Sequence, residues 1–325
     1  MQKQPRSAAA AKLDVTVRPL REDDLDAADH IVRLAFGTFL GLPEPTAFMG
    51  DAGHVRSRWR ADPAAAFAAE VGGELVGSNF ATHWGSVGFF GPLSIRPDVW
   101  DRGVGKRLMA PIMDCFANWG TVHAGLFTFA HSQKHVGLYQ NFGFWPHFLT
   151  AIMSKPVQPM GQTLRWSRFS EVQAGARKSI LSACRELTDE IYPGLDVSRE
   201  ITAVAAQALG DTVLLWGDMG LVGLAVCHCG PGTEAGGGTC YVKFGAARPG
   251  PTVVQDFGRL LEACEEMAAE RGLARLVAGV NTARHEAYRV MLERHFRTDM
   301  QGVSMHRPNE AGYNRPGVLL IDDWR

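Results

Sequence analysis

The junction between a strand and a helix at residues 91–108 holds the residues best suited to bind an anion. Its sequence is GPLSIRPDVWDRGVGKRL, in which an apolar strand ends, a short loop follows and an amphipathic helix begins. The first N–H groups of a helix have no partner within the helix and lie at the positive end of its dipole. Glycines at 103 and 105 let a diphosphate approach the main chain. Arg102 and Lys106 add positive charge, so the junction predicts a diphosphate loop, although a plain helix start with glycine in its turn would look similar.

A second pattern lies at residues 132–144, SQKHVGLYQNFGF. It predicts a short helix that carries Tyr139 four residues before the pair Gly143 and Phe144. Gly143 suits the position after the last helical turn, where a left-handed backbone is common. The tyrosine therefore sits near the end of a helix that follows the proposed anion loop after one strand.

Together the two patterns resemble the acyl-CoA-binding motifs of the GNAT superfamily, the GCN5-related N-acetyltransferases. The first motif is usually written [Gln/Arg]-x-x-Gly-x-[Gly/Ala], and it falls here on Trp100, Gly103 and Gly105. Trp100 departs from the usual Gln or Arg and removes one polar contact. In the second motif Ser132 stands where the family often has Asn. The motifs occur in the family's order, separated by one strand.

The resemblance implies that acetyl-CoA is the co-substrate, that no metal takes part, and that the acceptor is a primary amine of a small molecule or a peptide. The pantetheine arm is expected to pair with the fourth strand, which splays from its neighbour. The expected contacts are Leu93, Ser94, Ile95, Arg102, Gly103, Val104, Gly105, Lys106 and Ser132.

The resemblance also assigns catalytic roles. A tyrosine of the family protonates the departing thiolate, and that role falls on Tyr139, with a core tyrosine as the alternative. Many members take a glutamate near the fourth strand as the base, but residues 88–95 contain none. His83 is the nearest group with a pKa near neutrality, and a partly exposed structural histidine is an equal alternative. Glu70 is a weaker candidate, and His131 and His135 are interpreted as solvated or structural.

The elements that must hold these residues occur twice along the chain. Strands are predicted at 15–19, 65–71, 74–84, 88–95, 123–130 and 144–157 in the first half, and at 212–216, 220–228, 239–246, 275–280 and 302–306 in the second. Helices are predicted at 22–40, 51–60, 103–119 and 132–141, then at 170–191, 198–209, 253–270 and 283–295. The same order of elements in both halves indicates a duplication.

The repeat is also visible in the residues. SIRPDVWDRGVGKRLM lies over AARPGPTVVQDFGRLL without a gap, which places Gln255 opposite Gly103, Phe257 opposite Gly105 and Met291 opposite Tyr139. Each change removes a feature of the cofactor site, so the second copy is predicted to be degenerate.

The predicted class is therefore α/β (α+β): two tandem GNAT folds, each a mixed, mostly antiparallel sheet flanked by helices, with a splayed strand pair for acyl-CoA. The predicted boundaries are an acyl-CoA-binding domain at 14–157, a linker at 158–168, a degenerate GNAT-like domain at 169–308 and a C-terminal tail at 309–325.

Composition bounds the remaining possibilities. A net charge of −1 and the lack of a long basic run argue against nucleic acid. No stretch reaches the length of apolar residues that a membrane span needs, and the N-terminus lacks the apolar core of a signal peptide. Six cysteines are too few for a disulfide scaffold, so the cytoplasm is expected. The sequence is compatible with a homodimer. The alternative function is a non-catalytic module that binds or senses acyl-CoA.

Overall fold

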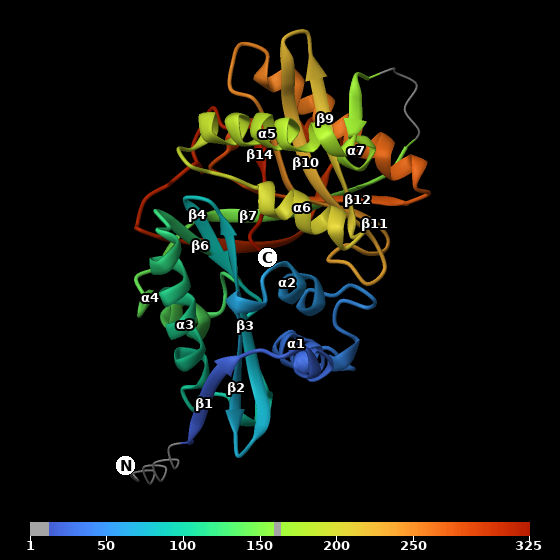
Figure 1. Ribbon diagram of the computed structural model, residues 1–325. Helices are drawn as coiled ribbons and strands as arrows, with labels where there is room; N and C mark the ends of the chain where they lie inside the picture. The colour runs from blue at the N-terminus through green and yellow to red at the C-terminus, as the bar shows by residue number, and fades with distance from the viewer. Residues whose placement is uncertain (1–12, 159–163) are drawn as a thin grey trace, which may run out of the picture.

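A computed structural model describes residues 13–158 and 164–325 and shows two halves joined side by side (Figure 1). Residues 159–163 of the predicted linker and the first twelve residues lie outside the described part. The first half contains β1 (Val15–Pro19), α1 (Leu25–Phe39), α2 (Val55–Ala61), β2 (Ala66–Val71), β3 (Glu74–Trp84), β4 (Val87–Phe90), β5 (Ser94–Ile95), α3 (Val104–Trp119), β6 (His123–Thr128), α4 (Gln133–Gln140) and β7 (Trp145–Pro156). The predicted order of elements in this half is confirmed.

The second half repeats this order after a short strand β8 (Trp166–Arg168). It contains α5 (Arg177–Ile191), α6 (Ser198–Ala206), β9 (Gly210–Gly217), β10 (Gly220–Gly230), β11 (Gly236–Ala247), α7 (Val253–Glu270), β12 (Arg275–Asn281), α8 (His285–Glu293), β13 (Arg297–Arg307) and β14 (Leu320–Ile321). Helices flank a mixed sheet in both halves, as the tandem fold predicts.

One sheet of 14 strands runs through both halves, and the halves exchange their last strands at its centre. The order there is β6-β13-β7-β12. Strand β13 of the second half pairs antiparallel with β6, with Val303 opposite Thr128. Strand β7 of the first half pairs antiparallel with β12, with Val277 opposite Ser154. The predicted last strand of the first unit therefore completes the sheet of the second, so the halves share backbone hydrogen bonds as well as a surface.

The splayed strand pair is present in the first half. Strands β4 and β6 run parallel and pair only from Val87 to Phe89. The predicted strand at 88–95 is then interrupted at Gly91, whose φ of 143° favours glycine. Beyond it, β5 pairs only with β3, through Ser94 and Ile95. The edge of β5 that would face β6 is thus left without a strand partner.

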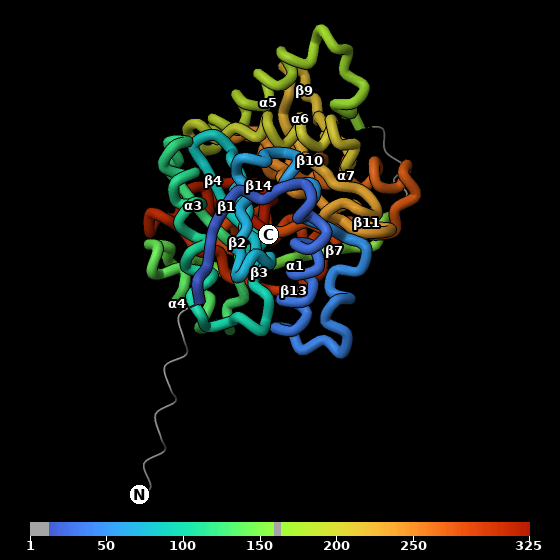
Figure 2. Tube along the Cα trace, turned by 60° about the horizontal axis from the view of Figure 1, so that its bottom comes forward, coloured from blue at the N-terminus to red at the C-terminus, as the bar shows by residue number. Residues whose placement is uncertain are grey.

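The corresponding gap in the second half is filled by the chain itself. Strands β11 and β12 pair in parallel over Thr239–Val242. Farther along β11, the C-terminal segment enters as β14, pairing antiparallel through Leu320 and Ile321 with Ala246 and Gly245. Residues 309–325, predicted as a tail, are therefore partly built into the sheet, and the end of the chain lies near the centre of the molecule (Figure 2).

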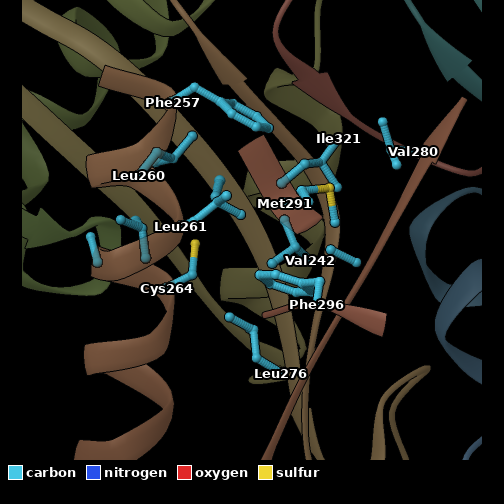
Figure 3. Packing of buried hydrophobic residues seen from close by; sticks show 14 of the residues in the cluster. Val242, Phe257, Leu260, Leu261, Cys264, Leu276, Val280, Met291, Phe296 and Ile321 are labelled. Carbon is cyan, nitrogen blue, oxygen red and sulfur yellow. The ribbon is translucent and has the colours of Figure 1, made fainter. Parts of the chain in front are cut away.

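Amphipathic helices close each half over the sheet. In the second half Phe257, Leu260, Leu261 and Cys264 on α7 pack with Met291 on α8 and Phe296 in a fully buried cluster (Figure 3). In the first half α3 contributes Met109, Ile112 and Phe116 to a smaller cluster. No helix within residues 13–158 and 164–325 combines the length and apolar character needed to cross a membrane.

Candidate active site

A cavity of about 370 Å³ opens where the splayed strands meet the start of α3. Its floor is the loop of Gly103, Val104, Gly105 and Lys106, and Leu93 and Ile95 line the wall beside it. Ser132 on the opposite side belongs to the start of α4. Seven of the nine predicted cofactor residues therefore line one cavity, and Ser94 and Arg102 do not.

The two glycines of the loop are needed for different reasons. Gly103 has a φ of 81° and precedes the first residue of α3, a backbone that favours glycine, while a Cβ there would meet open space. At Gly105 a Cβ would lie 2.9 Å from Cδ1 of Ile95 and 3.3 Å from Cδ2 of Leu138. Gly105 thus allows α3 to approach β5 and α4 closely, and protein side chains fill the space that the sequence predicts for the ligand.

The side chains of Ser94 and Trp100 both make contacts within the protein that the sequence did not indicate. The Ser94 side chain is buried and lies 3.2 Å from the hydroxyl of Ser78, so only its main chain is available to a ligand. The indole N–H of Trp100 donates to the Ile95 carbonyl at 2.7 Å. Trp100 therefore forms a wall of the cavity, and its polar atom is already used.

Positive charge lines the end of the cavity at the start of α3. Lys106 and Lys134 both line it, and Lys134 lies 2.7 Å from Asp101 and over the ring of Trp100. Arg102 is exposed next to the loop. Together with the N–H groups of α3, these cations form a site suited to a diphosphate. Lys134 was not among the predicted contacts.

Helix α4 places one face on the cavity. Ser132 caps it, with its hydroxyl 3.5 Å from the His135 N–H. His135 and Tyr139 lie one turn apart, so their side chains share a face. His135 lines the cofactor cavity, and both residues line a second cavity of about 290 Å³.

The second cavity adjoins the first. Phe36, Leu93 and His135 line both. The remaining wall comes from α1, the loop before α2, strands β4 and β6, and the residues Met300, Trp324 and Arg325 of the second half. A long molecule in the first cavity would therefore meet a second molecule at the shared residues, which is the arrangement that a group transfer needs.

Tyr139 is placed and protonated as an acid would need to be. It is 7% exposed, its ring meets the ring of Phe90 edge-on at 5.5 Å, and burial raises its pKa above the usual value of phenols. Within the described part of the chain its hydroxyl has no hydrogen-bond partner. The O–H group is therefore free to donate to a bound molecule.

His135 stands where the two cavities meet, although the sequence suggested a solvated or structural role. Its ring packs against Phe39 with centroids 5.0 Å apart. Burial, with help from the charges of Lys134 and His131, lowers its pKa below the usual 6.5. The ring is consequently neutral at pH 7 and can accept a proton.

The structure does not bring His83 into this site. His83 lines a separate cavity of about 50 Å³ between α2 and α6, and its ring stacks on Trp119 with centroids 4.6 Å apart. Glu70, the weaker candidate, is held by Arg18, whose Nε donates to it at 2.8 Å. Neither residue lines the cavity that contains Tyr139, and a catalytic role for His83 stays a prediction.

Sequence reasoning missed His54, which lines the second cavity from the loop before α2. Its Nε2 lies 3.9 Å from Glu234 of the second half, and its Nδ1 is buried without a partner. Burial lowers its pKa to about 3. Glu234 itself is held by Arg58 at 3.0 Å and Lys243 at 2.8 Å. No local pattern links residues this far apart, because only the joining of the two halves brings them together.

At the corresponding positions of the second half, the described residues fill the space that is open in the first. Phe257 and Met291, which correspond to Gly105 and Tyr139, are both fully buried in its core (Figure 3). Gly245 and Ala246, which correspond to Leu93 and Ser94, pair with β14 instead of offering a free edge. The space that is open in the first half is thus occupied by side chains and by the chain's own C-terminal segment.

Residues 31–144 match the sequence profile described as the acetyltransferase (GNAT) family. No curated protein gives a match to the chain.

Several solved structures share the fold over nearly the whole length. An acetyltransferase candidate from Pyrococcus horikoshii has a TM-score of 0.66 at 13% identity and covers 98% of this chain and 97% of its own. A GCN5-related N-acetyltransferase from Sphaerobacter thermophilus has a TM-score of 0.57 at 14% identity, and the match covers 90% of this chain and 95% of that protein. A tandem GNAT protein from the clavulanic acid biosynthesis pathway has a TM-score of 0.54 at 12% identity, and the match covers 90% of this chain and 98% of that protein. These likenesses establish the tandem fold.

Proposed function

We propose, from the match of residues 31–144 to the GNAT profile and from the site described above, that the protein is an N-acetyltransferase. It would move an acetyl group from acetyl-CoA to a primary amine of a small molecule or peptide, with one active site per chain. The observation that carries the proposal is the junction of two cavities at Phe36, Leu93 and His135, with Tyr139 beside it. We place the activity in the cytoplasm and assign it no metal.

The first cavity suits the co-substrate in shape and charge. Acetyl-CoA supplies a thioester at the end of an arm that begins at a diphosphate. Lys106, Lys134 and the start of α3 would hold the anionic end. The free edge of β5 would pair with amide groups of the arm, as an added strand pairs with a sheet edge.

The second cavity provides the groups for proton transfer. The amine nitrogen forms a bond to the acyl carbon, the carbon–sulfur bond breaks, and the thiolate takes the proton of the Tyr139 hydroxyl. The neutral ring of His135 accepts the proton that the nitrogen loses. Both groups lie on one face of α4, so one rigid helix positions acid and base.

The test is thiol release from acetyl-CoA with a panel of amines, together with calorimetry of acetyl-CoA on the intact chain. We expect one binding site and amine-dependent release. Gly103→Gln introduces the residue of the second copy at a φ of 81°, with a strain of about 1–3 kcal/mol at the loop, and should weaken binding. Gln255→Ala at the matching exposed position is the control and should not.

Three results would contradict the proposal. Two equivalent sites would show that the second half binds the cofactor. A Gly103→Gln protein with unchanged affinity would show that the loop is only a turn. Binding without thiol release for any amine would favour the alternative, an acyl-CoA-binding module.

A further inference from the structure

We propose that the second cavity, the acceptor cavity, takes a flat apolar amine that is uncharged at neutral pH, of which an arylamine is the simplest kind. A cationic polyamine or the lysine side chain of a peptide would be excluded. This inference rests on the proposed function, because it names the substrate class of the same site.

The walls of the acceptor cavity are mainly apolar, and several of the apolar side chains are aromatic. They include Phe36, Phe48, Phe90, Phe127, Phe129 and Trp324. Phe36 and Phe48 lie parallel, with ring centroids 5.4 Å apart and planes within 8°. Aromatic walls favour flat apolar ligands, through burial of area and through stacked or edge-on ring contacts.

The charges around the acceptor cavity oppose a cation. No lining side chain in the described part of the chain is acidic, and the guanidinium of Arg325 is the one permanently charged side chain among them. The guanidinium of Arg325 lies 3.1 Å from Asp323 and over the ring of Tyr241. An ammonium group would lose its hydration here without gaining a carboxylate partner, which is costly.

A second carboxylate behind the wall, Glu234, is also compensated. Glu234 stands behind His54, and its side chain is fully buried. Arg58 and Lys243 hold it, and Lys243 also lies 3.0 Å from Glu200. Two cations thus balance two carboxylates, so this cluster offers no net negative charge to attract an ammonium group.

Neutral acceptors of hydrogen bonds do face the acceptor cavity. His54 lines the acceptor cavity, and burial lowers its pKa to about 3, so its ring stays neutral. His135 is neutral as well. Both rings can accept from the N–H groups of an uncharged amine. Such an amine needs no deprotonation before it attacks, which agrees with the absence of a carboxylate base among these lining residues.

The size of the acceptor cavity also favours a small molecule. Its volume of about 290 Å³ lies at the lower end of small-molecule sites. The second half narrows it by contributing Met300, Trp324 and Arg325. A compound of one or two rings fills this space, whereas a peptide main chain needs an open groove.

The experiment measures binding and acetyl transfer separately, on the full chain with CoA or acetyl-CoA. The probes are 4-ethylaniline, spermidine and a lysine-containing tripeptide. We expect 4-ethylaniline to bind at least tenfold more tightly than either cation and to be acetylated. If it binds and is not acetylated, the substrate class stands and the proposed function fails. If only spermidine or the tripeptide is bound or acetylated, the proposed function stands and the proposed substrate class is overturned. If none of the three compounds binds, the substrate class is overturned as well.

Charge variants give a second test. Met300→Glu places a carboxylate on the half-buried wall of the acceptor cavity. We expect this variant to bind 4-ethylaniline at least tenfold more weakly than the wild type does. The ratio of its affinities for 4-ethylaniline and spermidine should also be smaller. Met49→Glu, on the loop before α2, repeats the test if Met300→Glu fails to fold. Met219→Glu on a remote, fully exposed turn is the control. An unchanged preference in folded Met300→Glu protein would overturn the inference.

Discussion

Two buried tyrosines let catalysis be separated from stability by the same chemical change. The Tyr139 hydroxyl has no hydrogen-bond partner among the described residues and faces the acceptor cavity. The Tyr313 hydroxyl accepts from the indole N–H of Trp324 at 3.0 Å and donates to Asp322. Replacing each by phenylalanine keeps the ring and its packing, so only the role of the hydroxyl is tested.

The expected magnitudes differ in kind. Tyr139→Phe removes no internal hydrogen bond, so its free energy of unfolding should change by less than about 0.5 kcal/mol. Its turnover should fall by about 10²-fold, the lower end for general acid catalysis, because a thiolate is a fair leaving group. Tyr313→Phe leaves a buried indole N–H unpaired, which should cost about 1–3 kcal/mol of stability.

The assay is thiol release at saturating acetyl-CoA, together with urea unfolding of each variant. Met291→Leu is the matched control in the second copy, where volume is nearly conserved and little should change. The acid role of Tyr139 would be refuted if its Phe variant kept full turnover. Loss of turnover together with a large loss of stability would assign Tyr139 to the core instead.

Three further predictions follow from buried charges. The kcat/KM of the wild type should rise with pH through a pKa below 6.5 as His135 loses its proton, and His135→Gln should remove this limb from the pH profile. Burial lowers the pKa of His306 to about 2, so below pH 6.5 this group gains a proton only in the unfolded chain. Urea unfolding at pH 5 should therefore show a loss of stability to which His306 contributes about 2 kcal/mol and which His306→Asn reduces by that share; an unchanged pH dependence in the variant would contradict this. Glu234→Gln leaves Arg58 and Lys243 without their shared carboxylate and should lower the free energy of unfolding by about 3–5 kcal/mol. The control is Glu293→Gln, at an exposed ion pair. If both variants lost the same small amount of stability, water would be compensating the two cations, and the prediction would be wrong.

The parts of the fold that depend on local patterns could be predicted from the sequence. Helix α7 begins and ends as predicted because apolar residues recur at the helical period and Gly272 follows it. Strand β3 has its predicted bounds because Gly72 and Gly73 form the turn before it. The cofactor cavity follows the same logic, since its loop, its helix start and its strand are adjacent in sequence.

The acceptor cavity could not be predicted because its residues come from distant segments. Helix α1 and the loop at 48–54 meet β6 and residues 300–325 only after the halves have exchanged β7 and β13. A histidine at 83 and one at 135 look alike in sequence. The fold decides between them, because β3 directs His83 toward α6 while α4 directs His135 toward the cavity junction.

The degenerate second copy contributes to the first through the chain's C-terminal segment. A strand edge that is left open is a liability, and β14 covers the edge of β11 with two residue pairs. Because Leu320 and Ile321 are fixed there, the residues that follow them have only a short span to reach the first half. Trp324 packs with His306 and Tyr313 at the centre of the sheet, and Arg325 ends at the acceptor cavity. By pairing with β11, strand β14 thus positions Trp324 and Arg325 in the wall of the acceptor cavity, so the cavity of the first half is complete only with residues of the second.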